Sequence, residues 1–373
     1  MKIACALAVI AGTCIGVGFF VLPYVTLKVG FWVILGYFFL LGGLVIIVHM
    51  FFGELALKTP DFKRMPGFAK IYLGKWGQSL AYVSTVVGIL GALLVYLIVG
   101  GEFLTELVSP FLGGSSLICT LFYFAAGATF IFFGIKAIAK VEFWGLILFF
   151  LILFVIFLQG KPLLDVDNLF NTPDKSFLFL PYGIILFCLW GATMIPEVEE
   201  MLGEKRKLIL KIIPVAIFIP IIVYLFFIYL ILGITGPATT ESALSGLRNV
   251  LGDGVVSLAL IFGILTTFTS FIALGLNLKK VFYFDFKINE KLAWAITCFV
   301  PLILFLIGIK GFIALISLIG GVMLGIEGIL ILLMCRKSYA KLKQATFKCL
   351  SVYPLILIFL VGIIYEIIYF VKR

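Results

Sequence analysis

Three glycines, Gly12, Gly16 and Gly18, interrupt the first apolar stretch of the chain. A helix needs about 20 residues to cross the hydrocarbon core of a bilayer, and glycines near its middle weaken it there. In lipid, an opened turn leaves backbone N–H and C=O groups unpaired, at a cost of several kcal/mol each. The spacing therefore predicts a discontinuous helix, non-helical near residues 13–18, whose bare backbone binds a solute. The alternative is a glycine-rich face that only lets a neighbouring helix pack closely.

The sixth apolar stretch carries a matching interruption, formed by Gly191 and Pro196. Glycine weakens a helix, and proline removes one N–H donor and clashes with the preceding turn. We expect a non-helical segment near residues 187–193 that faces the first break close to the middle of the membrane. Interruptions at corresponding positions of two halves indicate the binding site of a transporter. The pair therefore favours a transporter over a generic helical bundle.

Composition predicts a polytopic integral membrane protein. Hydrophobic residues make up 64% of the chain and charged residues 12%, with a mean hydropathy of +1.28. A soluble domain carries about 25% charged residues, so almost nothing is left for an extramembrane domain. The seven cysteines are scattered and predict apolar filling rather than disulfides. His49 is the only histidine, which excludes a multi-histidine metal site.

Eleven apolar stretches, separated by charged or turn-rich breaks, predict eleven membrane spans. With the N-terminus in the cytoplasm and the C-terminus outside, 21 of the 28 lysine and arginine residues fall on the cytoplasmic side. The net charge of +10 is thus a topology signal and not evidence of nucleic-acid binding. A cleaved signal peptide is rejected, because no polar mature region follows. The predicted spans are 3–27, 31–53, 77–104, 117–135, 141–159, 178–198, 208–233, 252–278, 291–309, 311–334 and 349–371.

Spans one and six are the first helices of two halves, each of five helices. We expect a first repeat over residues 1–159, a second over residues 177–334, and an additional eleventh helix over residues 349–371.

Several short motifs resemble, in order, those of the amino acid/polyamine/organocation superfamily of permeases. Residues 12–24 resemble its signature G-x-x-I-G-x-G-x-x-x-L-P-Y, and residues 53–56 resemble its Y-A-E-L-A motif. Residues 199–206 resemble its E-E-x-K-N-P-K-R loop, with Gly-Glu in place of Asn-Pro. Residues 269–285 resemble the T-S-F and L-G-L motifs of the aromatic branch. The likeness covers essentially the whole chain and is closest to the amino acid/auxin and bacterial tryptophan/tyrosine permeases.

The resemblance implies an all-α leucine-transporter fold, a 5+5 inverted repeat with discontinuous helices 1 and 6. It implies an ion-coupled secondary transporter of a neutral L-amino acid, with aromatic ones among the candidates, in a bacterial or archaeal cell membrane. Sodium or protons are the expected coupling ions, and no organic cofactor is expected. The alternatives are a transporter of another small organic solute and an intramembrane enzyme. The enzyme is disfavoured, because neither a metal motif nor a paired catalytic set is present.

An amino-acid zwitterion places specific demands on the breaks. Its carboxylate needs N–H donors and the positive end of a half-helix dipole, which Gly16 to Gly18 supply. Its ammonium needs carbonyl oxygens, which the stretches near Thr13 and Phe187 offer. Aromatic side chains near the breaks are candidates for the pocket, although core packing is the commoner role for any one of them. The predicted substrate-binding residues are Thr13, Gly16, Val17, Gly18, Tyr96, Phe187, Trp190 and Gly191.

Span eight carries four hydroxyls within residues 266–270. Such hydroxyls usually bond back to their own helix, which is the structural alternative. Thr269 and Ser270, with the carbonyls of Gly12 and Ile15, could instead surround a sodium ion. Relatives with a sodium site place hydroxyls of this kind here, but proton-driven relatives share much of the pattern.

Ionisable residues in or beside the spans are few and include His49, Glu54, Glu142, Glu327 and Glu366. Because a charge at a helix centre costs about 3 kcal/mol or more, each should face the bundle or a water path, or be protonated. We expect a salt bridge or hydrogen bond for Glu327, two turns from Arg336, with proton coupling as the alternative. Glu54 is expected near Lys58, Glu366 away from the transport path, and His49 in the bundle as a satisfied residue.

Overall fold

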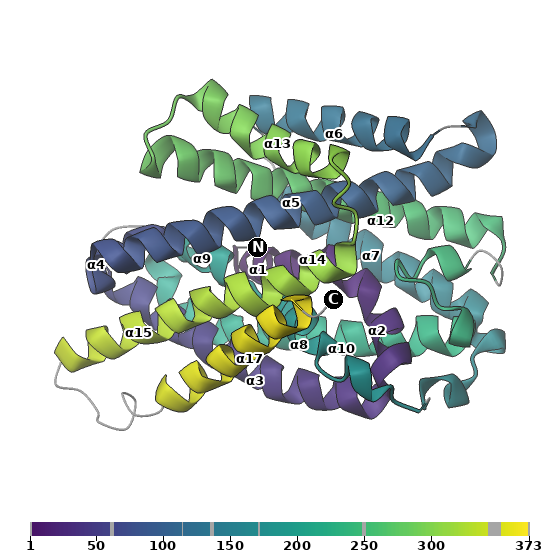
Figure 1. Ribbon diagram of the computed structural model, residues 1–373, viewed down its shortest axis with the longest axis horizontal. Coiled ribbons are helices and arrows are strands. Elements are labelled where there is room, and N and C mark those ends of the chain that lie inside the picture. The colour runs from purple at the N-terminus through teal and green to yellow at the C-terminus, as the bar shows by residue number, and fades with distance from the viewer. Residues whose placement is uncertain are drawn as a thin grey trace.

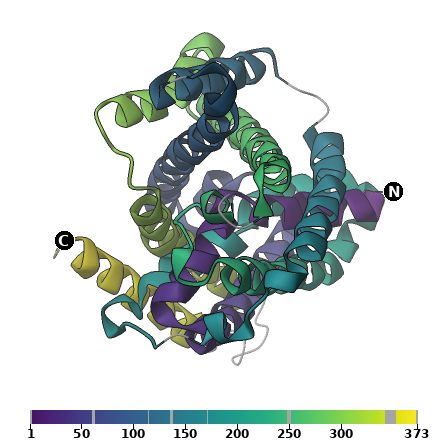
Figure 2. The same ribbon diagram turned by 90° about the vertical axis from the view of Figure 1, so that its right-hand side faces the viewer.

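The computed structural model describes residues 2–59, 63–113, 115–134, 138–170, 172–247, 251–341 and 352–371. Within these ranges every regular element is a helix, and most helices run along the long axis of the molecule (Figure 1). Figure 2 looks along that axis and shows the helices in cross-section around the N-terminal segment. Helices α6 (Ser116–Phe133) and α13 (Glu290–Leu306) form an outer layer against α5 (Lys75–Leu112) and α12 (Asp253–Lys280).

Seven helical stretches are long and apolar enough to cross a membrane, and the bent pair at the N-terminus brings the number to eight. One of the seven, Leu180–Ala238, covers all but the first two residues of the predicted span 178–198 and the whole of the span 208–233. Each of the eleven predicted spans contains a helix, while residues 135 and 349–351 lie outside the described part. The remaining α-helices are α1 (Lys2–Cys14), α2 (Leu22–Val29), α3 (Phe31–Lys58), α4 (Met65–Leu73), α7 (Ile138–Gly160), α8 (Leu180–Leu189), α9 (Ile195–Leu202), α10 (Ile209–Thr235), α14 (Phe312–Leu318), α15 (Gly325–Lys341) and α17 (Val352–Val371).

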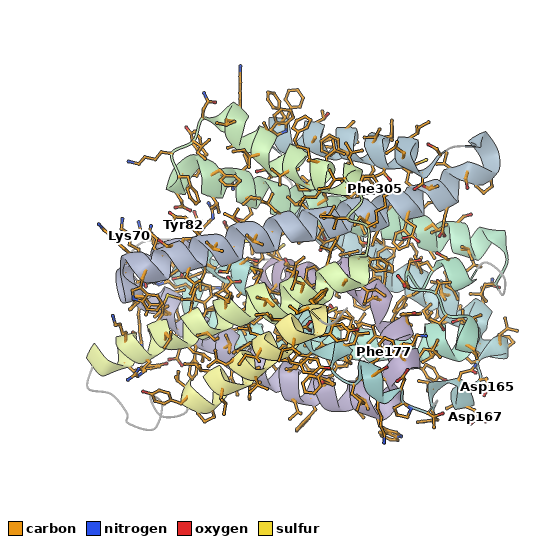
Figure 3. All side chains as sticks on the ribbon, viewed as in Figure 1. Lys70, Tyr82, Asp165, Asp167, Phe177 and Phe305 are labelled. Carbon is orange, nitrogen blue, oxygen red and sulfur yellow. The ribbon has the colours of Figure 1, made fainter. Side chains whose placement is uncertain are left out.

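The two ends of the bundle carry the charged connections. Figure 3 places Lys70 at one end of the long axis and Asp165 and Asp167 at the other. Lys70 belongs to the second connection and the two aspartates to a loop of short 3₁₀ turns after α7. This separation fits a long axis that crosses the membrane, with the connections on its two sides.

The first predicted break is present. Helix α1 ends at Cys14, Ile15 and Gly16 lie outside any helix, and a 3₁₀ turn, η1 (Val17–Val21), leads into α2. The two halves are bent by 47° relative to each other. Gly16 has an extended backbone, with φ −109° and ψ −157°. The break thus lies inside the predicted range of residues 13–18.

The second predicted break is present as well. Helix α8 ends at Leu189, and a 3₁₀ turn, η5 (Ala192–Met194), separates Trp190 and Gly191 from α9. Pro196 lies in the first turn of α9, where its missing N–H leaves no hydrogen bond broken. The proline therefore starts the second half of the helix, and Gly191 lies in the break itself.

A π-helical segment, η10 (Ile319–Leu324), separates α14 from α15 in span ten. Its glycine Gly320 packs directly on the backbone of α8, because a Cβ there would lie 1.8 Å from the carbonyl oxygen of Gly183. In the opposite direction, a Cβ on Gly183 would lie 2.1 Å from the carbonyl oxygen of Ser317. Such contacts without side chains let membrane helices approach closely. They fix α8, and with it the second break, against span ten.

Candidate functional site

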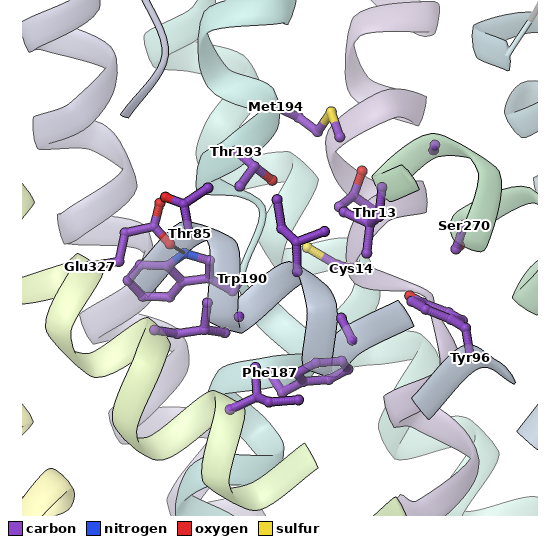
Figure 4. Close-up of a pocket in the computed structure, with 18 of the residues that line it drawn as sticks. Thr13, Cys14, Thr85, Tyr96, Phe187, Trp190, Thr193, Met194, Ser270 and Glu327 are labelled. Carbon is purple, nitrogen blue, oxygen red and sulfur yellow. Dashed lines mark hydrogen bonds between the residues drawn. The ribbon is translucent and has the colours of Figure 1, made fainter. Parts of the chain in front are cut away.

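A cavity lies between the two breaks (Figure 4). Helix 1 contributes Thr13, Cys14 and Gly16 to its wall, and span six contributes Phe187, near the end of α8, and Trp190, in the second break. The rest of the wall comes mainly from α5, α12 and span ten. These further lining residues are Ser84, Thr85, Gly88, Ile89, Ala92, Tyr96, Thr193, Met194, Ser270, Ala273, Leu274, Ile319, Leu324 and Glu327.

Five of the eight predicted substrate residues line this cavity: Thr13, Gly16, Tyr96, Phe187 and Trp190. They come from three segments that are far apart in the sequence. The structure therefore brings together the groups that the sequence placed at the two breaks and on the third span.

The other three predicted residues, Val17, Gly18 and Gly191, are not part of the cavity wall. A Cβ on Gly18 would lie 2.8 Å from Sγ of Cys188. A Cβ on Gly191 would lie 3.0 Å from Cγ2 of Ile10. Both glycines thus permit helices 1 and 6 to pack on each other. This is the close-packing alternative stated above for a glycine-rich face.

Tyr96 covers the bare backbone of the first break. A Cβ on Gly16 would lie only 2.3 Å from Oη of Tyr96, so the absence of a side chain at Gly16 is what lets the hydroxyl approach. Tyr96 is 3% exposed and borders the cavity beside Ser270 (Figure 4). Tyr96 therefore contributes a polar group to the part of the cavity next to helix 1.

The hydroxyl of Tyr224 joins the two breaks. It lies 2.5 Å from the carbonyl oxygen of Cys14 and 2.9 Å from that of Cys188. Helix termini leave such carbonyls without their usual helical partners, although the Cys14 carbonyl also accepts a hydrogen bond of 2.8 Å from the backbone N–H of Gly16. Tyr224 is fully buried on α10, and the pattern of the sequence around it does not distinguish it from an ordinary core aromatic.

The variant Tyr224→Phe is expected to lower the free energy of unfolding by about 1–3 kcal/mol, because it removes the hydroxyl that two buried carbonyls share without changing the packed volume. Thermal unfolding in detergent measures the loss. Tyr229→Phe, on the same helix, is the control, since the Tyr229 hydroxyl makes no hydrogen bond to another described residue. Equal stability of the two variants would contradict this role.

His49 also stabilises the second break. Its Nε2 accepts a hydrogen bond of 2.9 Å from the backbone N–H of Gly191. Nε2 therefore carries no proton in this arrangement. The ring also packs edge-on against Trp190, with 5.0 Å between the ring centroids. His49 thus caps an opened turn through Nε2, while its buried Nδ1 has no hydrogen-bond partner among the described residues, so the expectation of a fully satisfied side chain is met at one ring nitrogen only.

Glu327 is paired with Trp190 and not with Arg336. The indole N–H of Trp190 donates to Oε2 of Glu327 over 3.0 Å, whereas the Arg336 guanidinium lies 5.0 Å from the centroid of the Tyr353 ring. Glu327 is 2% exposed and lines the cavity.

Glu54 and Glu366 lie outside the cavity wall. Oε1 of Glu366 accepts a hydrogen bond of 2.9 Å from the Ser317 hydroxyl, and Glu54 accepts one from the hydroxyl of Tyr339. The side chain of Glu142 lies outside the described part of the structure.

A second, smaller cavity contacts all four predicted ion-binding residues, Gly12, Ile15, Thr269 and Ser270. The Thr269 hydroxyl donates to the carbonyl of Thr266 over 3.1 Å, as the structural alternative requires. A hydroxyl that donates in this way keeps its lone pairs, so it can still coordinate a cation. Ser270 borders both cavities. Among the described residues, no three His, Cys, Asp or Glu side chains come together to hold a metal ion.

Comparisons with known proteins agree with this architecture. The model of the tryptophan/tyrosine permease family matches residues 1–369. Tyrosine-specific transport system 1 of Haemophilus influenzae is 24% identical over 286 residues, which cover 73% of this chain and 70% of that protein.

Two solved structures share the fold, each with a TM-score of 0.65. The first is Mhp1, a nucleobase-cation-symport-1 family transporter with bromovinylhydantoin bound; it is 14% identical, over 97% of this chain and 92% of that one. The second is MhsT in complex with L-phenylalanine; it is 15% identical, over 99% and 98%.

The family match identifies the protein as a secondary transporter, an integral membrane protein and not an enzyme, and the two solved structures show that it has the leucine-transporter fold. The chain belongs to the tryptophan/tyrosine permease family.

Proposed function

We propose that this protein is an ion-coupled symporter of a neutral aromatic L-amino acid, working by alternating access. The observation that carries the proposal is the cavity between the two helix breaks, which combines bare backbone at Gly16 with the aromatic side chains of Phe187 and Trp190. Backbone amides at a half-helix N-terminus suit a carboxylate. Aromatic walls suit an aromatic side chain.

In this proposal the substrate carboxylate binds at Gly16, Val17 and Gly18, beside the Tyr96 hydroxyl. In this proposal Val17 and Gly18, which lie outside the cavity wall, reach the carboxylate with their backbone N–H groups when the first break rearranges around the substrate. The ammonium binds carbonyl oxygens near Thr13. The Cys14 and Cys188 carbonyls are less available to it, because Tyr224 already contacts them. Gly191 holds the second break close to helix 1.

The proposed coupling ion is sodium, bound by Thr269, Ser270 and the carbonyls of Gly12 and Ile15. The second cavity supports this choice, because it gathers these four residues next to the first break. The proton is the competing ion, and Glu327 is then the coupling group. The orientation with a cytoplasmic N-terminus and the two repeats, residues 1–159 and 177–334, belong to the same proposal.

Substrate affinity is expected to rise with sodium by about 5- to 150-fold, since both ligands order the same unwound segment and the coupling is reciprocal. Thr269→Ala and Ser270→Ala should each reduce this dependence and leave sodium-free binding in place. Binding measured in sodium and in potassium at fixed pH tests the prediction. Equal affinity in both salts would rule out the sodium site and assign coupling to protons, and Glu327→Gln should then alter the pH dependence of transport.

Uptake into proteoliposomes tests the function as a whole. A panel of radiolabelled amino acids is offered under imposed sodium or proton gradients. Concentrative uptake of an aromatic amino acid under one gradient supports the proposal. Uptake of a different class of solute, with no aromatic amino acid transported, would contradict it.

A further inference from the structure

Two buried polar atoms in the cavity wall have no hydrogen-bond partner among the described residues. They are Oε1 of Glu327 and Oγ1 of Thr85. The two residues are 2% and 8% exposed. A buried carboxyl or hydroxyl oxygen without a partner costs free energy until another group pairs with it. The two atoms therefore form a polar part of the wall that a ligand can satisfy.

The Glu327 carboxyl group is held in a fixed orientation. The Trp190 indole N–H occupies its Oε2, which leaves Oε1 as the oxygen without a partner. Trp190 is in turn packed against the rings of His49 and Phe359. The carboxyl group is thus positioned by packed side chains before any ligand binds, as a specific site requires.

Glu327 and Thr85 lie on one side of the cavity, near Trp190, and Tyr96 and Ser270 lie on the other (Figure 4). Under the proposed function, the substrate carboxylate binds at the Tyr96 side, next to Gly16. The amino and carboxyl groups of an amino acid share one carbon, so the ammonium also binds on that side. The side chain of the substrate then extends toward Glu327 and Thr85.

We propose that Glu327 and Thr85 form a subsite for the phenolic hydroxyl of a tyrosine-like substrate. A phenol can donate its proton to Oε1 of Glu327 and accept one from the Thr85 hydroxyl, which pairs both atoms at once. An indole N–H can only donate, so it pairs with Glu327 and leaves Thr85 unpaired. A phenyl ring pairs with neither. The inference rests on the proposed function and adds the basis of its selectivity.

The test compares binding of L-tyrosine and L-phenylalanine to the purified protein in lipid nanodiscs. The wild type is expected to prefer tyrosine by at least about tenfold, because a buried polar site left unpaired rejects the analogue without the hydroxyl. Thr85→Val keeps the shape of the side chain and should reduce the preference several-fold, with phenylalanine affinity unchanged. Glu327→Met should abolish the preference.

Thr297→Val is the matched control, because Thr297 is also buried but bonds to its own helix at Ala293. It should leave the preference unchanged. If Glu327→Met does not fold, Thr85→Val alone decides the outcome.

Equal affinity of the wild type for tyrosine and phenylalanine would overturn the subsite and leave the proposed function standing. An equal loss of both ligands in the Thr85 and Glu327 variants would also overturn it, and would assign Glu327 to the ammonium that both share. If the wild type bound neither tyrosine nor phenylalanine, the proposed function itself would be contradicted.

Discussion

Replacing Gly16 with valine should abolish substrate binding while the protein still folds and inserts. The new Cβ would lie 2.3 Å from Oη of Tyr96, which is the tip of a side chain and can move aside. The displaced ring and the added methyl groups then fill the place of the substrate carboxylate. Losing two charge-assisted hydrogen bonds costs about 3–6 kcal/mol, or more than about a hundredfold in affinity. Ligand binding and size-exclusion profiles of the purified variant measure both effects.

A second pair of variants separates the clash from the loss of the ligand site. In a Tyr96→Phe background, Gly16→Ala no longer meets the hydroxyl, and the nearest remaining ring atom, Cζ, is 3.4 Å away. This double variant should be as stable as Tyr96→Phe alone, yet it should bind substrate more weakly than Tyr96→Phe does. Normal binding by Gly16→Val would show that the carboxylate is bound elsewhere.

Replacing Gly320 with alanine should prevent the protein from folding, in contrast to the Gly16 variant, which should fold but not bind substrate. Its Cβ would lie 1.8 Å from the carbonyl oxygen of Gly183 and 3.0 Å from the backbone N of Phe187. These are backbone atoms of α8, which cannot rotate aside as a side chain can. The helices would have to separate, and contacts along α8, α14 and η10 would be lost together. We expect little or no monodisperse protein after solubilisation, judged by fluorescence-detected size exclusion.

Gly36→Ala is the control for this substitution. Gly36 lies within α3, and a Cβ there meets nothing within 4 Å. Alanine is about 1 kcal/mol better than glycine inside a helix, so this variant should be as stable as the wild type or slightly more stable. Comparable yields of the Gly320 and Gly36 variants would show that α8 and span ten have room to separate.

The breaks in helices 1 and 6 could be predicted because their causes are local. Gly16 and Gly191 lie within the observed interruptions, and a glycine weakens a helix wherever it occurs in it. Pro196 contributed to the right prediction for a different reason, since it starts α9 instead of breaking a turn. Hydropathy likewise located a helix in each of the eleven spans, because the bilayer imposes length and apolarity on each span separately.

The sequence alone does not predict which backbone positions of the first break face the cavity. Gly16 and Gly18 are two residues apart and give the same signal in sequence, yet Gly16 borders the cavity and Gly18 packs on Cys188. The groups that stabilise the breaks were also missed. Tyr224 is 210 residues from Cys14, and His49 is 142 residues from Gly191. Only the packing of distant helices brings such pairs together, and no local pattern encodes it.

The Tyr224 hydroxyl has one proton for two carbonyl oxygens, so it cannot form two full hydrogen bonds at the same time. If helix 1 moves away from helix 6 in the proposed transport cycle, the hydroxyl can turn fully to the carbonyl that stays in reach, and that hydrogen bond strengthens as the other is lost. Separation then costs less than the rupture of a whole hydrogen bond. A hydroxyl shared by two carbonyls can thus hold two discontinuous helices together and still lower the energetic cost of a relative displacement between them.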